Sequence, residues 1–174
     1  QGFVEHYDRE FRMDTAFYNR VGITSGWGYT DWNFYPGSGR YSWIRRITPF
    51  VYSQYTEDRV ARGSERVTVP GLRMNFTRQG FFRIDKIIGH EHWLGQKYEL
   101  SRPRIQGEIQ LFRWIRLNGN VNWGPATFYD EVAPFAGWSR SSSFDLSWQP
   151  SPRMSQSIGY TRVDFRRAHT RARG

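Results

Sequence analysis

The order of hydrophobic and polar residues along this chain is dominated by a period of two. In the stretch 104–123 the alternating sets are Ile105, Ile109, Leu111, Leu117 and Val121 on one side, and Arg104, Glu108, Arg116, Asn118 and Asn120 on the other. Successive side chains of a β-strand point to opposite faces. The stretch therefore predicts two strands, each with one apolar and one polar face, joined by a turn at 112–116.

The phase of the alternation also predicts how these two strands pair. Partners in an antiparallel hairpin point to the same side of the sheet, so apolar residues must oppose apolar residues. Pairing Leu111 with Leu117 meets this condition, and it places Ile109 opposite Gly119. We expect this register.

Two further hairpins follow the same construction. The first is predicted from Leu72, Met74 and Phe76, followed by Phe82 and Ile84, with Phe76 opposite Phe82. The second is predicted from Phe144, Leu146 and Trp148, followed by a turn at 149–153. Downstream of that turn the phase changes, because Ile158 and Tyr160 share one face while Val163 and Phe165 share the other. A β-bulge near Thr161 is predicted to reconcile the two phases.

The connections between the predicted strands differ in kind. Short turns are expected at 36–41 and within the three hairpins, whereas 58–65, 90–102 and 125–137 lack alternation, are charged or contain Gly and Pro, and are expected to be long loops. About eight to ten strands of roughly ten residues each are thus joined alternately by short turns and long loops. This ordering is typical of an antiparallel up-and-down outer-membrane β-barrel, all-β in class.

Tryptophan positions agree with this interpretation. The aromatic residues near the short turns are Trp43, Phe81, Trp114 and Trp148, and those near a long loop are Trp123 and Trp138. Amphipathic indole rings favour the two membrane–water interfaces. We therefore expect these six residues to form two aromatic belts.

In such a barrel one strand face meets lipid and the other lines the lumen. The residues predicted to face lipid are Leu72, Met74, Phe76, Ile109, Leu111, Leu117, Val121 and Leu146. The residues predicted to face the lumen are Arg104, Glu108, Arg116, Asn118 and Asn120.

Composition narrows the class of protein. The chain has 174 residues with 8 Trp, 10 Tyr and 13 Phe, and this aromatic content opposes disorder. No window approaches the 18 or so uninterrupted apolar residues of a membrane helix, which excludes helical spanning but not spanning by strands. The mean hydropathy of −0.73 does not oppose a barrel, because a barrel carries polar residues at alternate positions.

The net charge of +9 comes almost entirely from arginine and predicts an anionic partner, which the sign alone does not identify. The strand arginines are compatible with a lumen that attracts anions or with contacts to lipid phosphates, and also with ordinary solvated charge pairing. Zero Cys excludes disulfides and thiolate metal sites.

Two motifs are candidates for chemical sites. His90 and His92 are two apart, a spacing compatible with a metal, but further ligands are not evident nearby, and a solvated loop is the favoured interpretation. Asp130 and Glu131 are adjacent and lack the opposed placement that glycoside cleavage needs. We therefore expect no catalysis by this segment, no metal and no cofactor.

Three stretches carry a resemblance to a known family: GFVEHYDRE at 2–10, SWIRRITPFVYSQY at 42–55 and SWQPSPRMSQSIGYTRVDF at 147–165. The chain resembles the uncharacterised C-terminal outer-membrane barrel domain that follows a family-9-like carbohydrate-binding module in Gram-negative envelope proteins. The resemblance covers nearly the whole chain, from Gly2 to about Phe165.

The resemblance implies that residues 1–174 are a single barrel-domain fragment, without the upstream module and the closing strands. It implies a bacterial outer-membrane location and, as partners, outer-membrane lipid, lipopolysaccharide and the upstream carbohydrate-binding-like module of the same chain. The expected role is transport or membrane anchoring linked to carbohydrate binding, with no nucleic acid as partner.

Two other functions stay open from the sequence. A soluble antiparallel carbohydrate-binding or glycosidase-accessory domain could use Trp93 or Trp138 as a sugar platform. A basic, aromatic β domain could instead stack single-stranded nucleic acid on its rings. The second function expects aromatic rings beside basic residues, whereas the alternation places rings with Ile, Leu and Met, away from the charges.

Overall fold

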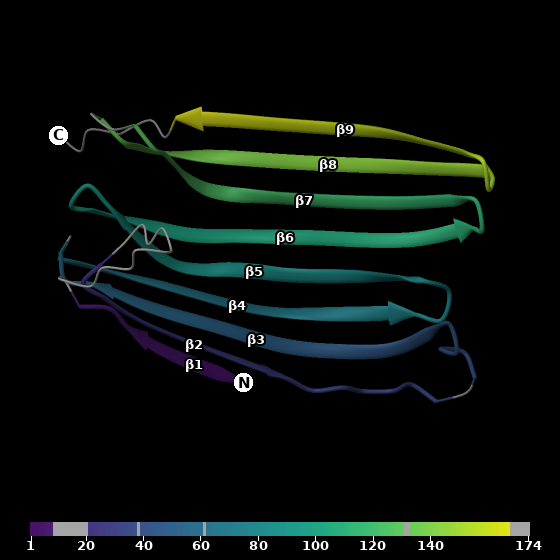
Figure 1. Cartoon of the computed structure of the whole chain (residues 1–174), viewed down its shortest axis with the longest axis horizontal. Helices are drawn as coiled ribbons and strands as arrows, with labels where there is room; N and C mark the ends of the chain where they lie inside the picture. The colour runs from purple at the N-terminus through teal and green to yellow at the C-terminus, as the bar shows by residue number, and fades with distance from the viewer. Residues whose placement is uncertain (9–20, 38, 61, 131–132, 168–174) are drawn as a thin grey trace.

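The computed structural model of the chain describes residues 1–8, 21–37, 39–60, 62–130 and 133–167. These residues form one antiparallel sheet in which nine strands lie side by side in chain order (Figure 1). The strands are β1 Gly2–His6, β2 Ile23–Asp31, β3 Ile44–Asp58, β4 Gly63–Phe76, β5 Gly80–Trp93, β6 Gln96–Phe112, β7 Ile115–Phe128, β8 Phe135–Ser151 and β9 Met154–Arg167. The sheet is not closed, because β1 and β9 are its edges. The predicted all-β, up-and-down architecture is confirmed, as an open sheet consistent with a partial barrel.

The sheet has a single layer, and this leaves it without an ordinary hydrophobic core. Among the described residues no apolar residue is fully buried, and the largely buried apolar residues are Ile44, Phe50, Val69, Tyr98 and Ala126. Strands β3 to β9 are 14 to 17 residues long, which exceeds the predicted ten. Because a soluble domain of this size normally packs two layers around one core, this fold needs another means of covering its apolar surface.

The hairpins are tighter than predicted. Leu117 of β7 pairs with Ile109, not with Leu111, and the register shifts between Gln110 and Phe112 next to the turn. In the β4–β5 hairpin Phe82 pairs with Met74, where we expected Phe76. Both expected registers are wrong by two residues. A slip of two keeps every side chain on its original face, so alternation alone does not distinguish these registers.

The predicted bulge near Thr161 is wrong. Thr161 pairs with Ser143 in a register that runs unbroken from Gly137 to Trp148, and the irregularity lies between Trp148 and Ser151. Phe165 therefore points to the face opposite that of Tyr160. It does so because its ring packs against the rings of Phe128 and Phe135, each with a centroid distance of 5.9 Å.

The expected difference between short turns and long loops is not present at the described connections. Only Leu94 and Gly95 join β5 to β6, within the region 90–102 that we expected to be a loop. Their φ angles of 46° and 77° are both positive, as a two-residue type I′ hairpin requires. The expected loops at 58–65 and 125–137 shrink to 59–62 and 129–134, while the expected short turn at 36–41 lies in the longer connection 32–43.

Strand ends rich in charged residues explain this error. His90 pairs with Glu99 and His92 pairs with Lys97, so a polar segment without apolar alternation continues the β5–β6 ladder. Backbone hydrogen bonds hold such a ladder even where neither face is apolar. The described part of the chain contains no helix that is long and apolar enough to cross a membrane.

Candidate functional site

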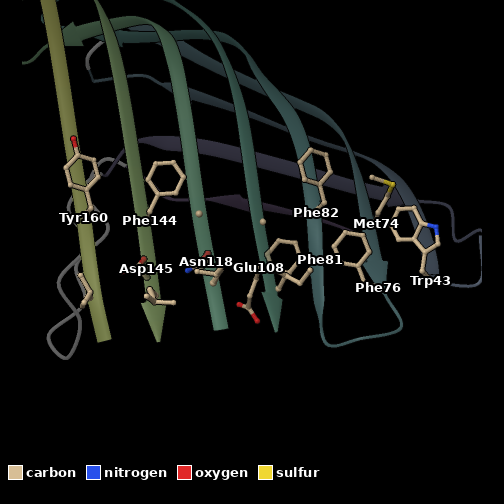
Figure 2. A pocket seen from close by; sticks show the side chains of 16 residues that line it. Trp43, Met74, Phe76, Phe81, Phe82, Glu108, Asn118, Phe144, Asp145 and Tyr160 are labelled. Carbon is tan, nitrogen blue, oxygen red and sulfur yellow. The ribbon is translucent and has the colours of Figure 1, made fainter. Parts of the chain in front are cut away.

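One face of the sheet carries a continuous set of apolar side chains, here called the apolar face. Its middle row consists of successive partners on β4 to β9: Met74, Phe82, Gly107, Gly119, Phe144 and Tyr160. Figure 2 shows the side chains of Met74, Phe82, Phe144 and Tyr160 at a similar level on their strands. The row crosses six strands, so the surface is built by register and not by any single segment.

Two more rows flank the middle one. Nearer the hairpin turns lie Ile109, Leu117, Leu146 and Ile158, and further from them lie Leu72, Ile84, Ile105 and Val121. The side chains are open to their surroundings: Phe144 is 50% exposed and Ile158 is 71% exposed. Contiguous apolar surface of this extent is rare on soluble monomers and marks contact with a membrane, a partner or a ligand.

A hollow of about 740 Å³ lies in this face. It forms where Gly107 and Gly119 stand next to each other in the middle row, between the rings of Phe82 and Phe144. The Phe144 ring leans over Gly119, since a Cβ added there would lie 3.1 Å from the ring atom Cδ1. The hollow is therefore walled by aromatic rings and floored by glycine backbone.

The structure brings together most of the residues that we predicted to face lipid. Seven lie on the apolar face or at its rim: Leu72, Met74, Phe76, Ile109, Leu117, Val121 and Leu146. Leu111 differs, because it lies within the register shift of β6 and lines a separate hollow with Phe112 and Arg113.

Six side chains of this face were missing from the prediction: Phe82, Ile84, Ile105, Phe144, Ile158 and Tyr160. The alternation around them is visible in the sequence. The opposite phase of Val163 and Phe165 obscured which face of the last strand joins the surface, and only the unbroken β8–β9 register decides it.

Most of the predicted belt residues lie near the expected ends of the strands. Trp43 lies beside Phe76 with a centroid distance of 5.7 Å, and Trp114 stacks on Phe112 at 5.3 Å, both next to hairpin turns. Trp148 lies opposite Ile115, also at this end. At the far side of the apolar rows Trp123 pairs with Arg140 and Trp138 pairs with Pro125.

Phe81 departs from its expected place. It pairs with Asn75 and Glu108, on the face opposite to Phe82. The guanidinium carbon of Arg73 lies 4.4 Å from the centroid of its ring, a cation–π contact. Phe81 therefore belongs to the polar side, and the consecutive phenylalanines 81 and 82 serve opposite faces.

The other side of the sheet, here called the polar face, holds the five residues that we predicted to face the lumen. Glu108 pairs with Asn118, and Asn120 is the next residue on that face of β7. Arg116 Nε donates to Glu108 Oε1 at 2.9 Å. The Asn120 Oδ1 atom is buried without a hydrogen-bond partner.

The fifth of these residues, Arg104, belongs to a buried charge cluster on the polar face. The side chain of Asp85 is completely buried, and it accepts hydrogen bonds from Arg104 and from Arg83. The Arg83 guanidinium also lies 4.6 Å from the ring centroid of Phe50. Two cations share one carboxylate here, so the cluster keeps a positive charge.

Beyond the apolar rows Glu91 ties two hairpins together. Its carboxylate accepts from Thr127 Oγ1 and from Tyr129 Oη, both at 2.7 Å. Burial and the hydrogen bond to Glu91 raise the pKa of Tyr129 to about 12. Trp93 packs edge-on against Tyr129. The Trp93 ring therefore belongs to this cluster around Glu91 and is not a free platform for a sugar.

The two motifs weighed as chemical sites gain no support. No group of three or more metal-binding side chains occurs among the described residues, and His90 and His92 lie within a strand. Asp130 Oδ1 accepts from the backbone N–H of Ala133 at 2.9 Å, while Glu131 lies outside the described residues.

Comparison of this chain with protein-family models, with curated proteins and with solved structures gives no match. The resemblance to an outer-membrane barrel family stays a prediction from the sequence.

Proposed function

We propose that this sheet is an arc of an outer-membrane β-barrel, with its apolar face against lipid and its polar face toward a water-filled interior. The observation that carries the proposal is the uncovered apolar face, which crosses β4 to β9, three rows deep on β6 and β7 and two rows deep on β8 and β9, with no second layer among the described residues. In a barrel the lipid replaces the missing layer, and alternation separates lipid from lumen.

The height of the apolar face supports this placement. Along β7 the face runs from Ile115 to Trp123, eight residues or about 27 Å at ~3.4 Å per residue. A strand tilt of about 40° reduces this to about 20 Å along the membrane normal, close to the ~25 Å apolar band of outer-membrane barrels. The height of the apolar face would therefore nearly match the thickness of the hydrocarbon layer.

Polar and charged residues end the apolar face at Ser142 and Arg162 on β8 and β9, and charged residues end it at the row of Trp123 on the other strands. Lys86 and Arg140 lie in this row, and Asp164 of β9 pairs with Arg140. Lys and Arg have long stems that can stay in apolar surroundings while the charged group reaches the headgroups. An indole beside an arginine is also the combination that a membrane–water interface favours.

For the role of the barrel we propose transport or membrane anchoring, linked to the carbohydrate-binding-like module that the sequence resemblance implies. The polar face supports transport more than catalysis. It holds arginines, asparagines and two carboxylates, Asp85 and Glu108, each of which is paired with arginine. A lumen lined in this way would favour anionic solutes.

Insertion into lipid vesicles tests the proposal with a matched pair of variants. Val121 and Asn120 are neighbours in β7 that point to opposite faces. In full-length protein refolded with vesicles, Val121→Arg is expected to disfavour insertion by about 2–4 kcal/mol if the position is near the midplane, since lipid cannot solvate the charge. Asn120→Arg is expected to insert nearly as well as the parent, and protease protection measures both.

Two results would oppose the proposal. One is equal insertion of Val121→Arg and Asn120→Arg. The other is a parent protein that stays monomeric in buffer without detergent and does not enter vesicles. That second result would favour the soluble carbohydrate-binding alternative, in which the apolar face is covered by protein.

A further inference from the structure

At the turn end of the polar face a β-bulge brings two consecutive arginines to one place. Ile44 pairs with Phe76 and Arg46 pairs with Asn75, so Arg45 is an extra residue in β3. A bulge of this kind re-aims side chains that would otherwise alternate. Arg45 and Arg46 accordingly both line a polar pocket of about 550 Å³.

The pocket collects a third arginine from the neighbouring strand. Arg73 lines it together with Asn75, Tyr35 and Glu108. Arg116 engages the Glu108 carboxylate through both Nε and Nη2, which reduces the charge that this acid offers to the pocket. Within the described part of the chain, no ion pair joins an acid to any of the three lining arginines.

Two polar atoms of the pocket residues are buried and have no hydrogen-bond partner. One is Arg73 Nε, a donor that suits an anion, and the other is Asn75 Oδ1, an acceptor that suits water or a protonated group. A buried polar group without a partner costs free energy, and in a native protein it calls for water, an ion or a ligand. The Phe81 ring holds the Arg73 guanidinium in place, which leaves its N–H groups directed rather than free to turn.

We propose that this pocket binds the phosphate group of a phosphorylated ligand, either a small solute or a lipid headgroup. Guanidinium groups present planar pairs of N–H donors that fit phosphate oxygens, and each such charge-assisted hydrogen bond is about twice as strong as a neutral one. Three guanidinium groups from two adjacent strands match a group with several anionic oxygens better than a single carboxylate. The site goes beyond the proposed barrel function, since it needs only the β3–β4–β5 part of the polar face.

Isothermal titration calorimetry of the detergent-solubilised chain with inorganic pyrophosphate tests the site. The parent chain is expected to bind one pyrophosphate, and Arg46→Gln is expected to weaken binding at least tenfold, roughly the loss of one charge-assisted contact. Arg46→Lys keeps the positive charge but lacks the planar pair of N–H donors. Its Kd for pyrophosphate should therefore lie between those of the parent and of Arg46→Gln. Arg153→Gln removes an exposed arginine at the same end of the sheet and serves as the control, with an unchanged Kd.

Because Arg46 is only partly buried, the Arg46→Gln variant should keep the strand signal of the parent in far-UV circular dichroism. Loss of binding with an unchanged spectrum supports a site. The proposal is overturned if the parent shows no saturable pyrophosphate binding. It is also overturned if Arg46→Gln and Arg153→Gln weaken binding equally, since that result would reflect only the net charge.

A competition measurement identifies the source of the phosphate. Micelles that contain phosphatidylglycerol should displace pyrophosphate if the ligand is a lipid headgroup and should leave it bound if the ligand is a solute. Vesicle insertion of the parent is measured separately, so failure of the phosphate site and failure of the barrel assignment give different results.

Discussion

Arg104 donates hydrogen bonds to both carboxylate oxygens of Asp85. Arg104 Nε lies 3.0 Å from Oδ1 and Nη2 lies 3.1 Å from Oδ2, and the two residues are direct partners in the β5–β6 ladder. The Asp85 side chain is 0% exposed, while that of Arg104 is 26% exposed. The geometry is that of a guanidinium fork on a buried carboxylate, with Arg83 as a second donor.

Removal of this carboxylate is expected to be costly. Asp85→Ala leaves Arg83 and Arg104 facing each other without an anion, and loss of one partner from a buried ion pair typically lowers the free energy of unfolding by about 3–5 kcal/mol. Urea unfolding in detergent measures the change. Asp164→Ala, which breaks the exposed pair with Arg162, is the control and should have a much smaller effect. Similar losses in the two variants would contradict the importance of burial.

Gly71 is expected to reject any side chain. A Cβ at this position would lie 2.4 Å from Phe50 Cζ and 2.7 Å from Asp85 Cβ. Gly71→Ala should therefore lower the free energy of unfolding by about 1–3 kcal/mol, because the Phe50 ring must shift. Gly28 is the control, since a Cβ there meets only a backbone oxygen at 4.0 Å. Thermal or urea unfolding that ranks Gly28→Ala below Gly71→Ala in stability would refute the packing described for Phe50.

The β5–β6 turn offers a stabilising substitution. Leu94 has a φ of 46°, a conformation that costs an ordinary L-residue roughly 1–2 kcal/mol and that Asn tolerates better. Leu94→Asn is expected to raise the free energy of unfolding by up to about 1 kcal/mol. Gly95→Ala, at a φ of 77°, should lower it. A destabilised Leu94→Asn variant would mean that the exposed Leu94 side chain makes a contact that outweighs the backbone cost.

Tyr129 provides a test by titration. Burial, and next the hydrogen bond to Glu91, raise the pKa of Tyr129 from its ordinary 10.0 to about 12. Because the folded state favours the protonated phenol, this contribution to stability is complete below pH 10 and is lost as the pH rises through about 12. Phenolate absorbance of the parent minus that of Tyr129→Phe isolates the titration.

The Glu91→Gln variant separates the two causes of this shift. It removes the neighbouring negative charge, so the pKa of Tyr129 should fall toward its ordinary value while burial keeps it above 10.0. Deprotonation of Tyr129 near its ordinary pKa in the parent chain would contradict the contact between Tyr129 and Glu91.

Alternation was sufficient to predict which neighbouring residues share a face. Leu117 and Val121 lie on one side of β7 and Asn118 and Asn120 on the other, because successive side chains of an extended chain must point in opposite directions. The antiparallel, all-β architecture followed from the same period. These properties depend only on local backbone geometry, which every strand obeys.

The polar pocket that we propose for phosphate was not predicted as a site. Arg45 and Arg46 are adjacent in the sequence, but their convergence on Arg73 depends on a bulge in β3 that the residue pattern does not predict. The place of Phe81 was missed for a related reason. Phe81 precedes Phe82 in the same strand, so it must point to the opposite face. The approach of Arg73 to the Phe81 ring, however, depends on the β4–β5 register.

The sequence by itself determined the class of the fold, the faces of the hairpin strands and the segregation of apolar from charged residues, since all three follow from a period of two along a single extended chain. The tertiary structure decided the registers, the lengths of the connections and the neighbours of each side chain. A slip of two residues preserves every face, so pattern leaves the register open. Cross-strand contacts such as those of Phe165 with Phe128 and Phe135 choose among the registers that pattern allows.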